Sequence, residues 1–78
     1  MADQKQIIEA IAEILTLPVG DIDPTASLQD DLGLSRMEVA DLFHNLAAKF
    51  NIIFDPSETE QVKTIGDLID LIEDKSLE

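Results

Sequence analysis

The sequence predicts an all-α fold, a four-helix bundle with a long loop between helices 1 and 2 and a short third helix. Apolar residues recur at the three- and four-residue spacing of amphipathic helices. Helix-cap signals stand before each of the three later helices. The one strand-like run, residues 51–54 (NIIF), is short and has no partner strand, so we expect an apolar loop there. Helices packed around one core follow from this pattern.

The first helix is expected over residues 3–16. Glu9 and Glu13 lie opposite its apolar face, and Pro18 and Gly20 end it. The apolar face consists of Ile7, Ile8, Ile11, Ile14 and Leu15. Residues 17–34 then form a long ordered loop, and loops of this length in compact domains are often functional. The residues expected to pin it to the core are Ile22, Leu28, Leu32 and Leu34.

The three later helices each follow a cap signal. Ser35, with Glu38 three residues on, opens a helix over about 36–50. Ser57 with Glu60 suggests a short third helix by the same logic, and Thr64 with Asp67 opens a fourth over about 65–74. The apolar positions are Met37, Ala40, Phe43, Leu46, Ala47 and Phe50 in the second helix, and Ile65, Leu68, Ile69 and Ile72 in the fourth.

The size of the chain favours a binding or carrier module. Its 78 residues make one domain, over residues 1–76, while Leu77 and Glu78 could be a cloning scar. With 45% hydrophobic residues the chain should fold. A pocket that encloses a substrate is hard to build in so small a core. Because cysteine is absent, thiol nucleophiles and thiolate metal sites are excluded.

The net charge of the chain indicates which classes of partner it can bind. Five Lys or Arg against seventeen Asp or Glu give a net charge of −12, which repels nucleic acids and anionic membranes and favours basic patches on proteins. The alternative is that acidity only keeps a small domain soluble. No signal peptide or membrane span is recognisable, so we expect a cytoplasmic protein, acting as a monomer.

The sequence gives little indication of a catalytic pair or a metal site. His44 is the only histidine and has no serine or cysteine one helical turn away, so no catalytic pair is expected. We read it as a surface residue that could make partner contact pH-sensitive. The four aspartates near the long loop do not have EF-hand spacing, and no metal site is predicted there. They are Asp21, Asp23, Asp30 and Asp31.

The order of the helices, with residues 31–37 (DLGLSRM) opening the second and residues 62–69 (VKTIGDLI) entering the fourth, resembles the acyl carrier protein family. The resemblance covers residues 5–74. It implies a non-catalytic carrier whose 4'-phosphopantetheine arm, received from coenzyme A through a phosphopantetheinyl transferase, bears acyl groups as thioesters for enzymes of fatty acid or polyketide biosynthesis. It also implies an acyl cavity, with Met37, Leu42, Leu46, Ile65 and Leu68 as candidate lining residues, although plain core is an equal reading.

The attachment motif departs from the family. Members carry Asp-Ser-Leu, whose Ser holds the arm; here the ungapped register gives Ser35, Arg36 and Met37. Ser35 is therefore the candidate attachment residue, shifted by one from the position that Arg36 holds. The alternative is that Ser35 is only a helix cap, contributing about 1 kcal/mol.

The partner face departs too. The resemblance implies acidic residues on the second helix facing basic partners, but here the acidic stretch is shortened, which suggests a dedicated partner and a specialised pathway. The candidate partner-binding residues are Asp30, Asp31, Arg36, Glu38, Asp41 and His44. The alternative function is an unmodified interaction or regulatory module that docks through its acidic loop and second helix.

Overall fold

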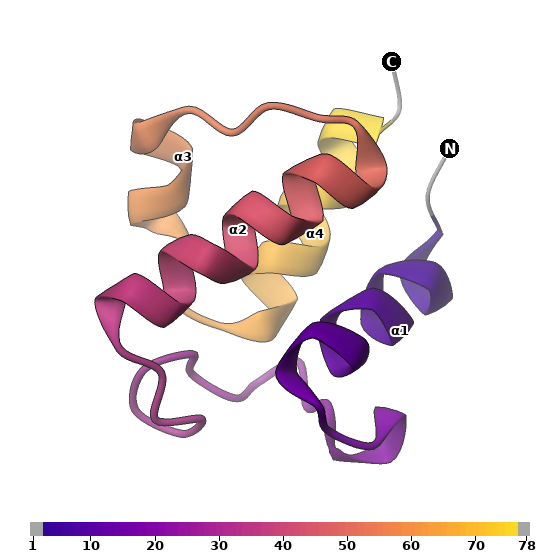
Figure 1. The fold of residues 1–78 in the computed structure, drawn as a ribbon, viewed down its shortest axis with the longest axis vertical. Coiled ribbons are helices and arrows are strands. Elements are labelled where there is room, and N and C mark those ends of the chain that lie inside the picture. Colours follow the sequence, from indigo (N-terminus) through magenta and orange to yellow (C-terminus); the bar gives the residue numbers. More distant parts are fainter. Residues whose placement is uncertain (1–2, 77–78) are drawn as a thin grey trace.

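The computed structural model describes residues 3–76 and is a four-helix fold, as predicted. Its elements are α1 (Gln4–Leu15), the 3₁₀ turn η1 (Val19–Asp21), α2 (Arg36–Phe50), α3 (Pro56–Gln61) and α4 (Ile65–Ser76). In Figure 1, α2 crosses in front of α4, with α1 on one side and α3 on the other. The long loop contains η1, which the sequence pattern did not predict, and α4 ends at Ser76 instead of residue 74.

The core is built by α1, α2, α4 and two residues of the long loop, Ile22 and Leu28. Its innermost helix side chains are Ile7 and Ile11 of α1, Leu42 and Leu46 of α2, and Ile65, Leu68, Ile69 and Ile72 of α4. Within residues 3–76 no polar or charged side chain is buried. No residue of α3 is buried, so this short helix lies on the bundle without completing its core.

The long loop is bonded to the chain entering α4. The N–H of Leu28 donates to Lys63 O at 2.9 Å, and the N–H of Gly66 donates to Pro24 O at 2.8 Å. A Cβ at Gly66 would lie 3.0 Å from the same Pro24 oxygen, a tighter contact than most Cβ atoms make, so a larger residue there would require the two backbones to move apart slightly. These bonds hold the loop, and with it the start of α2, against α4.

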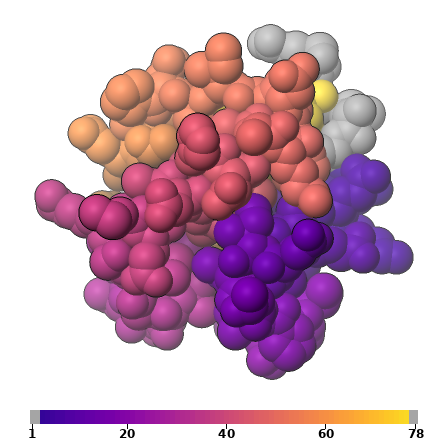
Figure 2. All heavy atoms as spheres, viewed as in Figure 1, coloured from indigo at the N-terminus to yellow at the C-terminus, as the bar shows by residue number. Residues whose placement is uncertain are grey.

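Packing between helices is completed by two ion pairs and one aromatic contact. Lys49 Nζ lies 3.8 Å from Glu13 Oε2, joining α2 to α1, and Lys75 Nζ lies 2.7 Å from Glu58 Oε1, joining α4 to α3. The rings of Phe43 and Phe54 meet edge to face with centroids 5.1 Å apart. Figure 2 shows side chains closing the space that the ribbon leaves open between α1 and α2.

Three sequence predictions about exposure are wrong. Ala40, predicted on the core face of α2, is exposed, because six positions, or about 600° of helix rotation, place it about 120° from Leu46. Met37, predicted on the core face, is 75% exposed, because nine positions, or about two and a half helical turns, place it opposite Leu46. Ile53, predicted in a loop packed under the bundle, is 81% exposed, although its neighbours Ile52 and Phe54 do pack against the core.

One predicted role also changes. The cap of α3 is Asp55, and Glu58, not Glu60, accepts a hydrogen bond from the cap N–H at 2.9 Å, since Pro56 is already the first helical residue. The candidate cavity-lining residues Leu42, Leu46, Ile65 and Leu68 are fully packed core. Both the cavity reading and the plain-core reading require buried side chains, so the part of these four residues in an acyl cavity stays a prediction. Leu77 and Glu78 lie outside the described residues.

Candidate functional site

The first turn of α2 is organised by a capping box. Ser35 Oγ accepts a hydrogen bond from the N–H of Glu38 at 3.1 Å, and Glu38 Oε1 accepts one from the N–H of Ser35 at 3.0 Å. Two backbone donors that no helical carbonyl could reach are thereby satisfied. Ser35 is the N-cap and Arg36 the first helical residue, both exposed, as the ungapped register predicts.

The approach to Ser35 is fixed by the loop before it. The N–H of Ser27 donates to Asp31 Oδ2 at 2.7 Å, and the N–H of Leu34 donates to Leu28 O at 3.1 Å. Gly33 has φ of 70°, in the left-handed region that glycine adopts without strain. Asp31, predicted as a partner-binding residue, thus already serves the loop through one carboxylate oxygen.

Two grooves flank α2. The polar groove, about 760 Å³, lies between the long loop, the start of α2 and the chain leaving α3. It is lined by residues 27–30, Arg36, Val39, Ala40, Phe43, Thr59, Glu60, Val62 and Lys63. The apolar groove, about 420 Å³, lies on the other side of Phe43. It is lined by Ala40, Phe43, His44, Ala47, residues 52–54, Pro56 and Thr59.

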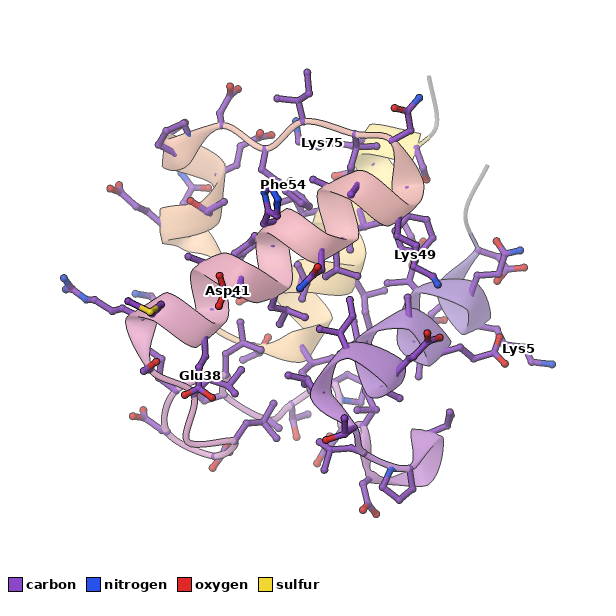
Figure 3. The ribbon with its side chains drawn as sticks, in the orientation of Figure 1. Lys5, Glu38, Asp41, Lys49, Phe54 and Lys75 are labelled. Carbon is purple, nitrogen blue, oxygen red and sulfur yellow. The ribbon has the colours of Figure 1, made fainter. Side chains whose placement is uncertain are left out.

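The predicted partner-binding residues are spread over these surfaces. Arg36 and Asp30 line the polar groove, while His44 lines the apolar groove. Figure 3 shows Glu38 turned back toward the loop and Asp41 on the front of α2. The structure therefore brings Arg36 and Asp30 to one groove and does not gather the six residues into a single patch. Their part in partner binding stays a prediction.

Lys63 is the groove residue that sequence reasoning missed. Its backbone is held firmly, because its carbonyl accepts from Leu28 and its N–H donates to Asp67 Oδ2 at 3.0 Å. That bond is the main cause that lowers the pKa of Asp67, followed by the bond from Thr64 N–H. Lys63 lies opposite α2 only because the long loop pairs with this segment. No pattern in the neighbouring residues predicts that position.

The polar groove is lined by charged side chains of both signs, Arg36 and Lys63 together with Asp30 and Glu60. Among residues 3–76, only Lys49 and Lys75 have a carboxylate oxygen within 4.0 Å, so Arg36 and Lys63 form no ion pair there. The same stretch contains no helix long and apolar enough to cross a lipid bilayer and no group of three or more side chains placed to hold a metal ion.

Comparison with known proteins gives concordant results. A family model described as a phosphopantetheine attachment site matches residues 5–72. An acyl carrier protein of Exiguobacterium sibiricum is 40% identical over 65 residues, covering 83% of this chain and 82% of that protein. One of Helicobacter pylori is 34% identical over 77 residues, covering 99% of both. The structure of an acyl carrier protein from Enterococcus faecalis matches the fold with a TM-score of 0.81 at 18% identity, over 96% of this chain and all of that one.

Proposed function

The chain belongs to the acyl carrier protein family, and from this premise we propose that it carries acyl groups as thioesters on a phosphopantetheine arm attached to Ser35. Members of this family are non-catalytic carriers, and the matched domain is a phosphopantetheine attachment site. The observation that carries the proposal is the place of Ser35, an exposed hydroxyl at the N-terminus of α2 and the only one in residues 31–37.

The residues around Ser35 fit an attached phosphate. Oγ acts as an acceptor toward the N–H of Glu38, so the hydroxyl proton, which a phosphodiester would replace, is not needed by the cap. The positive end of α2 and the adjacent Arg36 favour the negative charge. The Glu38 carboxylate on the N–H of Ser35 opposes it. When bound, the arm supplies a thiol on which an acyl group is held as a thioester.

The partners that support this function are a phosphopantetheinyl transferase and acyl-processing enzymes with basic patches. A net charge of −12 attracts such patches. Because Arg36 and the outward His44 interrupt the acidic surface of α2, we propose that these enzymes are dedicated to this carrier and serve a specialised branch of fatty acid or polyketide biosynthesis in the cytoplasm.

A second function is favoured by one observation. Arg36, which has no hydroxyl, occupies the first helical position, where the family places the serine that holds the arm. Ser35 would then be a cap alone, and the domain would dock unmodified, with Arg36 on the contact surface. This reading keeps the fold and removes the carrier chemistry.

The intact mass of the protein separates the two functions. The chain is incubated with coenzyme A and a transferase, both a broad-specificity enzyme and the one from its own organism. The proposal expects a one-arm mass gain that is lost in Ser35→Ala. The matched control is the double variant Ser35→Asp with Arg36→Ser, which keeps a good cap and restores a projecting serine. A gain in this variant only would show that the fold is competent, Ser35 is not the acceptor, and the docking function holds.

A further inference from the structure

We infer that the ion pair between Lys75 and Glu58 is a latch that holds α3 against α4, and that its release widens both grooves beside α2. This inference does not depend on the proposed function, because it concerns the fold of the unmodified chain. It gives α3 a conformational role, as a wall of the grooves that charge, not apolar packing, keeps in place.

The first support is the composition of α3. Its six residues, Pro56–Gln61 (PSETEQ), include no apolar side chain except the proline ring. None of them is buried, and only Glu58 and Thr59 are half-buried. A helix this short is not stable by itself in water, and without an apolar face it gains little from the hydrophobic effect. Polar contacts must therefore supply most of what fixes α3 on the bundle.

The second support is the geometry of the ion pair. Lys75 Nζ lies 2.7 Å from Glu58 Oε1, and the two side chains are 22% and 31% exposed. The other ion pair in the described part of the chain, Lys49 with Glu13, is longer, at 3.8 Å, and its side chains are 48% and 77% exposed. A short distance and partial shielding from water make the attraction between Lys75 and Glu58 the stronger of the two.

Glu58 also closes the helix that it attaches. Its Oε1 accepts a hydrogen bond from the N–H of Asp55, the cap of α3, at 2.9 Å, in addition to the bond from Lys75. The bond from Lys75, followed by the one from Asp55, lowers the pKa of Glu58, which keeps the carboxylate charged. Because one oxygen makes both contacts, the formation of α3 and its attachment to α4 are coupled.

The third support is the repulsion that Lys75 offsets. Glu58 lines a small groove of about 290 Å³ between α3 and α4. The other charged residues of this groove are carboxylates on α4, namely Asp67, Asp70 and Asp74. Without the Lys75 ammonium, Glu58 would face three like charges, which would drive α3 outward. A single positive charge therefore decides between the attached and the released position of α3.

The position of α3 sets the shape of both grooves. Thr59 lines the polar groove and the apolar groove, Glu60 lines the first, and Pro56 lines the second. Phe54 directly precedes the cap of α3, and its ring meets that of Phe43, which also lines both grooves. Movement of α3 away from α4 therefore opens both grooves together and displaces the aromatic contact between them.

The test is hydrogen exchange of the unmodified chain, measured by NMR. The reporters are the amides of Thr59 and Val62, which donate to Asp55 O and Thr59 O and are bonded only while α3 is formed. We expect both to exchange faster than the amide of Leu68 in α4, because α3 opens without unfolding the core. Equal protection of all three would overturn the inference, since α3 would then open only by global unfolding.

Variants identify the latch. Lys75→Gln should speed exchange at Thr59 and Val62 about fivefold, the upper end for a partly exposed ion pair. The matched control is Lys49→Gln, which removes the same charge from the ion pair between α1 and α2 and should leave exchange at α3 unchanged. Equal acceleration in the two variants would mean that net charge, not the latch, governs α3.

The double variant Glu58→Gln with Lys75→Gln separates the latch from a merely additive loss of contacts. A glutamine at position 58 keeps an oxygen for the cap N–H but no longer repels the carboxylates of α4. Exchange at Thr59 should therefore be slower in the double variant than in Lys75→Gln alone. Exchange as fast as in the single variant, or faster, would overturn the inference.

Relaxation dispersion of the ring carbons tests the effect on the grooves. In Lys75→Gln, the rings of Phe43 and Phe54 should exchange between two environments at the rate found for the amide of Thr59. Dispersion at Thr59 with none at the two rings would mean that the grooves keep their shape when α3 opens.

Discussion

The starts of α2 and α4 use the same local chemistry in opposite surroundings. At α4, the N–H of Asp67 donates to Thr64 Oγ1 at 3.1 Å and the N–H of Thr64 donates to Asp67 Oδ2 at 3.2 Å, the same exchange that Ser35 and Glu38 make at α2. Yet the first helical residue of α4, Ile65, is 0% exposed, while that of α2, Arg36, is exposed.

The difference shows that a helix cap does not by itself mark a functional site. In both places the cap satisfies backbone donors. At α4 the long loop lies on the helix start through the bond from Gly66 N–H to Pro24 O, so the first turn belongs to the core. At α2 the first turn faces solvent and the polar groove. Whether a capped helix start can serve as a functional site therefore depends on whether its first turn is buried or exposed.

The largest expected contrast is between the two first helical residues. Ile65→Ala should lower the free energy of unfolding by about 2–5 kcal/mol, because it opens a cavity in the core. Arg36→Ala, at the same helix position, should change it by less than about 0.5 kcal/mol. Urea denaturation followed by circular dichroism measures both. A loss at Arg36 as large as that at Ile65 would contradict the distinction.

The caps themselves should differ less. Ser35→Ala and Thr64→Ala should each lower the free energy of unfolding by about 1 kcal/mol, because each removes one acceptor for a helix-end N–H. Ser35→Asp restores an acceptor and should recover most of the loss at α2. Denaturation curves compare the three variants. If Ser35→Ala left the free energy of unfolding unchanged, Ser35 would not be acting as a cap. The interpretation of Ser35 as a cap alone would then be excluded.

The smallest contrast is in the response to acid. Hydrogen bonds from Lys63 and Thr64 hold the pKa of Asp67 below its ordinary value of 3.8. A carboxylate with a depressed pKa in the folded state adds stability that is present above 3.8 and is lost as the pH falls through the lower folded value. Carbon-13 NMR of the carboxyl group measures the pKa directly.

The control for this titration is Asp67→Asn. Acidification also relieves repulsion in a chain with a net charge of −12, so the useful quantity is the difference in stability between the native chain and the variant. This difference should shrink below pH 3.8. A pKa of Asp67 at or above its ordinary value would remove the reason for it.

Local signals predicted the helices well. The bounds of α2 follow from Ser35, Glu38 and the apolar spacing, all of which act within a few residues. Met37 was misplaced because three-residue spacing alone does not keep a residue on one face over two turns. The cap of α3 was misplaced because two overlapping signals, at Asp55 and Ser57, compete over two residues.

Patterns within short stretches of sequence could not predict the whole candidate site. Ser35 and Arg36 could be placed from the register of one segment, but Lys63 reaches the polar groove only because the loop pairs with the chain before α4. The isolated bridge between Ser27 and Thr64 belongs to this pairing. It joins residues far apart in the chain through backbone groups, which every residue type offers, so side-chain patterns carry no trace of it.

The ring of Phe43 is a natural NMR probe for the occupancy of the two grooves. It forms a wall of both grooves and touches Phe54 edge to face. The chain has neither tryptophan nor tyrosine and only three phenylalanines, so its aromatic proton spectrum is sparse. The ring current of Phe54 shifts the resonances of Phe43, and any occupant that moves either ring changes that shift. A change in the Phe43 resonances is therefore expected when either groove is filled.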